Sequence, residues 1–170
     1  MKQDRETEIK RAAALWNAGE PLEAGRIIFE GLPKEAQPAW AARILRLVLG
    51  RSCTQEKQLD RLLSIVDQPK EWGKAHDAFD SLRDLTLKLD RQRRRKPGDE
   101  QEVVNLHEGV VALAELVAKV TYNATDPDDE FDEDSGWWIA SSLRAFVDWW
   151  KDEDFSEAAW SALSSEPPAV

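Results

Sequence analysis

The sequence predicts an all-α fold, a single-domain irregular bundle of seven or eight helices. Apolar residues recur at steps of three and four through most of the chain, as they do along one face of a helix. No stretch alternates apolar and polar residues between turn residues, as a strand would. With 170 residues the chain has the length of one domain with its own core. We expect that domain to span residues 1–163, with a frayed tail at 164–170.

The fold is expected to form around one helix, Ser135–Lys151. On a helical wheel its polar residues share a narrow stripe with one tryptophan; the stripe contains Trp137, Ser141, Arg144, Asp148 and Lys151. The remaining arc is apolar and includes Trp138 and Trp149, so neighbouring helices must cover it. Trp137 is therefore the tryptophan that we expect at the surface.

Two short helices are predicted at the amino terminus. The first runs over residues 7–18 and stops at Gly19, and the second begins at Pro21 and ends near Gly31. The run from residue 12 to residue 33 resembles one tetratricopeptide-type (TPR-like) helical hairpin, through Leu15, Gly19, Glu23, Ala24, Ile28 or Phe29, and Pro33. The resemblance covers about 22 residues and implies a helix hairpin.

Five more helices complete the predicted bundle. One follows Pro38 and ends at Gly50, and one carries the apolar stripe Leu59–Val66. The helices expected at 72–92 and 102–121 form an antiparallel hairpin, because only a short turn with Pro97 and Gly98 separates them. After the central helix, a last short helix carries Phe155 and Leu163.

Charge is divided unevenly along the chain, whose net charge is −10. Residues 1–98 hold 20 of the 23 Lys and Arg and 15 acids, whereas residues 99–170 hold 3 basic residues and 18 acids. No run reaches the ~18 apolar residues of a membrane span, and the first residues lack a signal-peptide core. Together with the single cysteine, Cys53, this favours a cytoplasmic protein.

Residues 122–134 are predicted to form a solvated acidic loop, with Phe131 as the one residue able to attach it to the body. Such an acid density exceeds what solubility needs. We therefore expect a partner-binding surface here, and its residues are Asp126, Asp128, Asp129, Glu130, Asp132, Glu133, Asp134 and Trp137. The expected partner is a protein with a basic surface.

The basic run Arg91–Lys96 offers a different interpretation of the loop. These side chains resemble a phosphate contact, but the acidic second half would repel a nucleic acid. We expect instead that the run ends a helix, where the dipole favours positive charge, and faces the acidic loop. The loop then binds a partner, a cation, or Arg91–Lys96 itself. Its spacing lacks the glycine of a calcium-binding helix-loop-helix site.

No catalytic constellation is recognisable, and no catalytic residue, metal ligand or cofactor is predicted. His107 lies in an apolar arc, as a core histidine would, and His76 lies at the edge of a polar face. The leading hypothesis is a small non-enzymatic adaptor or inhibitor with an acidic surface. One alternative is a metal-assisted enzyme that uses His76 or His107 with carboxylates. Another is an acidic mimic of nucleic acid that blocks a DNA-binding protein.

Overall fold

Eight α-helices make up most of the chain in the computed structural model, which describes residues 2–167. They are α1 (Lys2–Asn17), α2 (Pro21–Glu30), α3 (Gln37–Ser52), α4 (Lys57–Val66), α5 (Ala75–Arg95), α6 (Gly98–Asn123), α7 (Ser135–Trp150) and α8 (Glu153–Ser164). Two 3₁₀ turns, Lys34–Ala36 and Pro69–Lys74, precede α3 and α5. No strand occurs between residues 2 and 167, which confirms the predicted all-α bundle.

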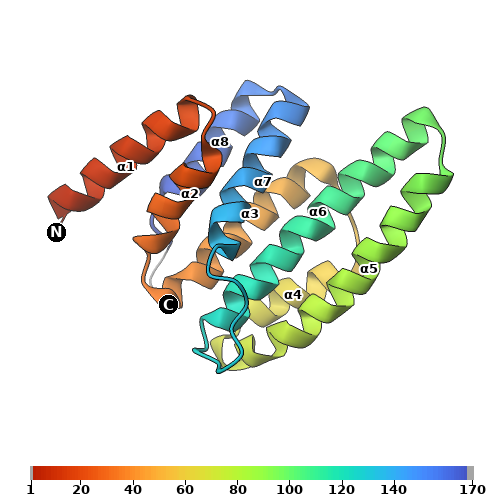
Figure 1. Cartoon of the computed structure of the whole chain (residues 1–170), viewed down its shortest axis with the longest axis horizontal. Coiled ribbons are helices and arrows are strands. Elements are labelled where there is room, and N and C mark those ends of the chain that lie inside the picture. The colour runs from red at the N-terminus through yellow and green to blue at the C-terminus, as the bar shows by residue number, and fades with distance from the viewer. Residues whose placement is uncertain (1, 168–170) are drawn as a thin grey trace.

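The helices form two layers. Figure 1 shows α1, α2, α7, α6 and α5 side by side in front, with α8, α3 and α4 behind them. Helices α5 and α6 form the predicted antiparallel hairpin, and α3 touches α6, α7, α8 and α4. The order of the front layer places α7 between α2 and α6, so the predicted central helix has a neighbour on each side.

Helix α3 supplies much of the core. Most of its wide apolar arc is buried, and Trp40, Ile44, Leu45 and Val48 are fully so. The Trp40 indole donates a hydrogen bond from Nε1 to the Leu163 carbonyl at 2.8 Å, and this bond ties α3 to α8. A buried indole N–H left without an acceptor costs free energy, so the bond lets a tryptophan occupy the centre of the core.

The predicted amino-terminal hairpin is present as α1 and α2. Gly19 adopts φ 81° between them, in the left-handed region that suits glycine. A second glycine, Gly25, lets α2 lie close to α7, because a Cβ atom there would come within 2.5 Å of the Ala140 Cβ. The chain thus forms the expected hairpin, and its relation to the tetratricopeptide family stays a prediction.

The predicted orientation of α7 is wrong in part. Part of the stripe expected to face water is covered by α1 and α2: Arg144 donates to the Trp16 carbonyl, and Trp137 is half-buried with the Arg26 guanidinium 6.0 Å from its ring centroid. Asp148 and Lys151 of the same stripe are exposed, as predicted. Two tryptophans of the arc expected to be buried are instead exposed, Trp138 by 47% and Trp149 by 49%. Arg144 and Arg26 provide the polar contacts between α7 and the amino-terminal hairpin. Because the hairpin covers this side of α7, Trp138 and Trp149 on another side are left exposed.

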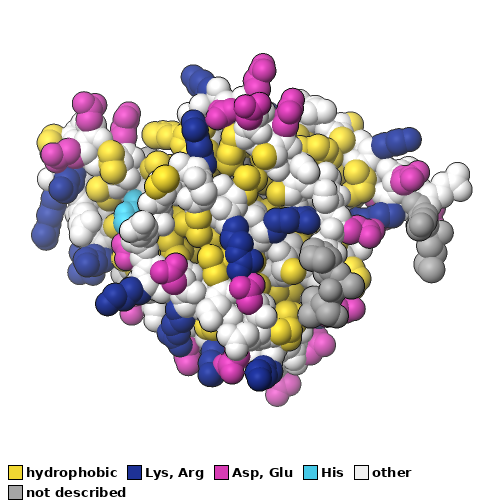
Figure 2. All heavy atoms as spheres, turned by 180° about the vertical axis from the view of Figure 1, so that it is seen from behind, with side chains coloured by type: hydrophobic (Ala, Val, Ile, Leu, Met, Phe, Trp, Pro, Cys, Tyr) yellow, Lys and Arg dark blue, Asp and Glu magenta, His cyan; other side chains and the backbone are white. Residues whose placement is uncertain are grey.

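The surface carries both kinds of charge. Figure 2 shows basic and acidic side chains interspersed on the face opposite to that of Figure 1. None of the described helices combines the length and the hydropathy that crossing a bilayer requires.

The residues that follow α8 contact α3, because Arg43 donates to the Ser165 and Glu166 carbonyls. The expected tail therefore contacts α3 at these residues, and its last three residues, 168–170, lie outside the described part.

Candidate protein-interaction surface

The acidic loop joins the antiparallel neighbours α6 and α7 (Figure 1), and its backbone is attached to the end of α6 by one residue pair. Asn123, the last residue of α6, accepts the Phe131 N–H at Oδ1 over 2.7 Å and donates from Nδ2 to the Phe131 carbonyl over 3.1 Å. One side chain thus satisfies both backbone groups of Phe131, as a strand partner would. The middle of the loop is thereby held at a fixed place beside the end of α6.

The Phe131 ring packs into an aromatic cluster. Its centroid lies 4.8 Å from that of Phe79, 5.1 Å from that of His76 and 5.6 Å from that of Tyr122. The Lys119 ammonium lies 5.8 Å from the same centroid. Such ring pairs add to the free energy gained from apolar burial. The prediction that Phe131 attaches the loop is therefore confirmed, but Phe131 is not the one attachment that was expected, because Asp126 and Glu130 also pair with Lys34.

Four carboxylates of the loop have partners within the protein. Lys34 pairs with Asp126 and, at 2.8 Å, with Glu130, and these hydrogen bonds raise the pKa of Lys34. The Tyr122 hydroxyl donates to Asp129, which lowers the pKa of that carboxyl. Asp134 accepts from the Trp138 indole at 3.0 Å.

Three other carboxylates of the loop are exposed and form no ion pair with the described residues: Asp128, Asp132 and Glu133. They project into solvent from a loop whose backbone is anchored. The arrangement therefore leaves three negative charges in a defined place and available to a partner.

The basic run Arg91–Lys96 does not face the loop, and that expectation was wrong. It lies at the turn between α5 and α6, whereas the loop begins at the other end of α6. The 26 residues of α6 span about 39 Å at 1.5 Å per residue. Part of the run is paired locally instead: Arg93 pairs with Asp90 and, at 2.9 Å, with Glu108. Among the described residues, Lys34 and not Arg91–Lys96 forms the ion pairs with the loop carboxylates.

The two histidines lie in different surroundings. His76 stacks in the aromatic cluster and shares one exposed face of α5 with Asp77 and Asp80, whose potential ligand atoms lie within 4.8 Å of one another. His107 lies 3.1 Å from Glu56 through Nε2, and its side chain is 29% exposed, so it is not the buried core residue that the wheel predicted. Among residues 2–167, no group of potential ligands contains both histidines. The alternative of a metal-assisted enzyme stays a prediction, and the described residues bring His76 and His107 to no common site.

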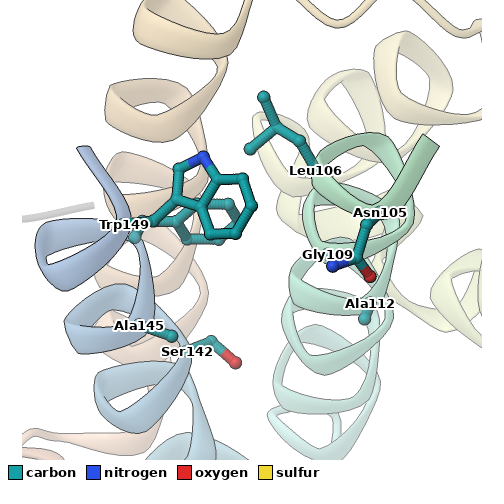
Figure 3. A pocket seen from close by; sticks show the side chains of 8 residues that line it. Asn105, Leu106, Gly109, Ala112, Ser142, Ala145 and Trp149 are labelled. Atoms are coloured by element: carbon teal, nitrogen blue, oxygen red, sulfur yellow. The ribbon is translucent and has the colours of Figure 1, made fainter. Parts of the chain in front are cut away.

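A groove runs along α6 and α7; its half far from the loop is mainly apolar, and its loop-end half also has charged residues, Arg83, Glu115 and Lys119. One pocket of about 270 Å³ lies between Asn105, Gly109 and Ala112 on one side and Ser142, Ala145 and Trp149 on the other (Figure 3). A second pocket, of about 490 Å³, lies toward the loop and is bounded by Trp138, Leu116 and Lys119. The helical wheel placed Trp138 and Trp149 on the apolar arc of α7. A wheel cannot show which part of that arc is covered by a neighbouring helix, so their exposure was missed.

Comparison with known proteins yields no match: no family model, no curated protein and no solved structure resembles this chain significantly.

Proposed function

We propose that this chain is a non-enzymatic protein-binding protein whose acidic loop meets a basic surface of its partner. The observation that carries the proposal is the anchored loop, in which Phe131 is fixed while Asp128, Asp132 and Glu133 point outward unpaired by the described residues. We place this activity in the cytoplasm, which agrees with the lone, unpaired Cys53.

Anchoring matters because ordering a flexible loop at the moment of binding costs conformational entropy. Here the Asn123 hydrogen bonds, the Phe131 packing and the Lys34 pairs fix the loop before a partner arrives. The free carboxylates then attract a basic partner from a distance and raise the rate of encounter. A loop that only improved solubility would need none of these attachments.

Site-directed photo-crosslinking tests the proposal. A photoreactive amino acid is placed at Glu133 in the loop and, in a matched control, at Asp60, an exposed acid of α4. We expect a protein to be captured from native cell extract at position 133 and not at position 60. Purified, that protein should bind the unmodified chain, and the binding should weaken as salt rises. The proposal would be contradicted if the captured protein bound with the same affinity after the loop acids were neutralised and at every salt concentration.

A further inference from the structure

Helices α6 and α7 present two stripes of residues with the same spacing to the groove. On α7 the stripe is Trp138, Ser142, Ala145 and Trp149, and on α6 it is Asn105, Gly109, Ala112 and Leu116. Both follow steps of four, three and four, which keep a stripe on one helix face. The two pockets share Ala112 and Ser142, so they form one continuous groove.

The groove is lined by small residues at its centre and by a tryptophan at each end. Small side chains line its centre, where a Cβ added at Gly109 would lie 3.5 Å from the Phe146 ring beneath. Trp138 and Trp149 stand at its two ends and are about half exposed. Exposed tryptophans beside an apolar hollow are typical of an interaction site.

A buried acceptor faces the loop end of the groove. Glu115 is only 7% exposed and lines the second pocket. Its Oε2 accepts the Thr86 hydroxyl at 3.2 Å, whereas its Oε1 has no hydrogen-bond donor, the Arg83 guanidinium being 3.7 Å away. A buried carboxylate oxygen without a donor costs free energy, and a ligand that supplies one removes that cost.

We propose that this groove binds an amphipathic helix of a partner protein, with Lys or Arg at the end of that helix that lies beside the acidic loop. The inference rests on the proposed function and names the part of the partner that is recognised. Trp149 lies eleven positions after Trp138, which corresponds to about 16 Å or three helical turns. A bulky apolar side chain of the partner fills the 270 Å³ pocket over Ala112 and Ala145.

Charge complementarity sets the direction of the bound helix. The loop that carries the free Asp132 and Glu133 leads into α7 just before Trp138, whose indole donates to Asp134, and Glu115 lines this end of the groove with an Oε1 that has no hydrogen-bond donor. Cations are favoured at a helix carboxyl terminus, so that terminus of the partner helix lies at the loop end. Two cations also line this end of the groove, but both already have partners: the Lys119 ammonium lies over the Phe79 ring at 5.3 Å, and the Arg83 guanidinium lies 3.7 Å from Oε1 of Glu115.

A second copy of the chain fits the groove less well. Two α7 helices packed antiparallel about their midpoint would set Trp138 against Trp149 and Ser142 against Ala145, which leaves the small centre unfilled. Two chains of net charge −10 also repel each other. A partner helix with a bulky apolar side chain at its middle would fill the centre of the groove, and its positive charge would avoid the repulsion.

The test uses nuclear magnetic resonance of the full ¹⁵N-labelled chain with a synthetic 14-residue helical peptide. The peptide carries leucines at positions 1, 4, 5, 8 and 12 and lysines at 13 and 14; reference peptides replace the lysines by glutamates or scramble the order. We expect the lysine peptide to shift the amides of Gly109, Ala112 and Ala145 and both exposed indoles. It should bind about tenfold more tightly than the glutamate peptide.

Two variants locate the peptide. Ala112→Phe fills the point where the pockets meet and Trp149→Ala removes one end, so each should weaken binding about tenfold. Leu87→Phe, at an exposed apolar position of α5 outside the groove, is the control and should bind as the parent does. Trp149→Ala alters an exposed side chain and should fold even if Ala112→Phe does not.

Several results would overturn the inference. Equal binding of the lysine and glutamate peptides, or no binding, would remove the groove as a site for basic helices. Shifts confined to residues 126–134, equal for the scrambled peptide, would do the same but leave the proposed function standing. A dimer in sedimentation that covers Trp138 and Trp149 would assign the groove to a second copy.

Discussion

Asn123 holds Phe131 through two hydrogen bonds, one to its N–H and one to its carbonyl, across eight residues of chain. This pair fixes the acidic loop where α6 ends. Without it, the Phe131 backbone would need water as its partner, and the ring would be held by packing alone.

Removing the Asn123 side chain should loosen the loop. Asn123→Ala deletes both hydrogen bonds and should lower the free energy of unfolding by about 1–3 kcal/mol. Amide hydrogen exchange at Phe131 should accelerate more than exchange in α3. The matched control is Asn105→Ala on the same helix, which should change neither quantity much. Unchanged exchange at Phe131 in Asn123→Ala would show that the loop is anchored by other contacts.

The Lys34 pairs should contribute little to stability despite their long reach across the sequence. The side chains of Lys34 and Glu130 are both more than one-third exposed, so solvent screens them. Lys34→Gln should cost less than about 1 kcal/mol, and the difference from the parent should shrink at 1 M salt. Denaturant melts at two salt concentrations measure both effects. A loss that persists in high salt would mean that Lys34 acts through packing.

Buried and exposed aromatic residues of the central helix should respond differently to truncation. Phe146 is buried and stacks on Trp150 with centroids 5.2 Å apart, so Phe146→Ala should cost about 3–5 kcal/mol. Trp149→Ala should cost under about 1 kcal/mol, because its side chain is half exposed. Chemical denaturation compares the two. Equal losses of unfolding free energy in the two variants would mean that Trp149 is buried in solution and does not border an open groove.

Glu115 should make stability fall as pH rises. Burial raises the pKa of Glu115 above its usual 4.5, so the folded chain binds a proton that the unfolded chain has released. Stability is therefore lost as pH rises from 4.5 through the folded pKa. Glu115→Gln has no carboxyl to ionise at this position. The melting temperature of the variant minus that of the parent should therefore increase as pH rises through that range. A difference that does not vary with pH would show that Glu115 ionises without cost.

Much of the fold is predictable because helix ends are local features. Gly19 with Pro21, and Pro97 with Gly98, mark turns that the structure contains, and the apolar steps of three and four mark the faces between them. Phe131 was identifiable as the loop's attachment because it is the only large apolar residue among the acids.

The misplaced parts of the candidate surface depend on long-range packing. Lys34 meets Asp126 and Glu130 across 92 and 96 residues, and no local pattern indicates that encounter. The wheel of α7 identified an apolar arc, but the helix order decides which part of it is covered. Because α2 covers Trp137, the exposed tryptophan beside the loop is Trp138.

The most direct test of the acidic loop as a binding surface is the rate of association with the captured partner, measured over a range of salt concentrations. The triple variant Asp128→Asn, Asp132→Asn, Glu133→Gln is compared with Glu6→Gln, Glu20→Gln, Asp60→Asn, which neutralises three exposed acids elsewhere. The loop variant should melt as the parent does, associate about tenfold more slowly at low salt and depend less on salt. Equal rates and equal salt dependence for the two variants would contradict the proposed function.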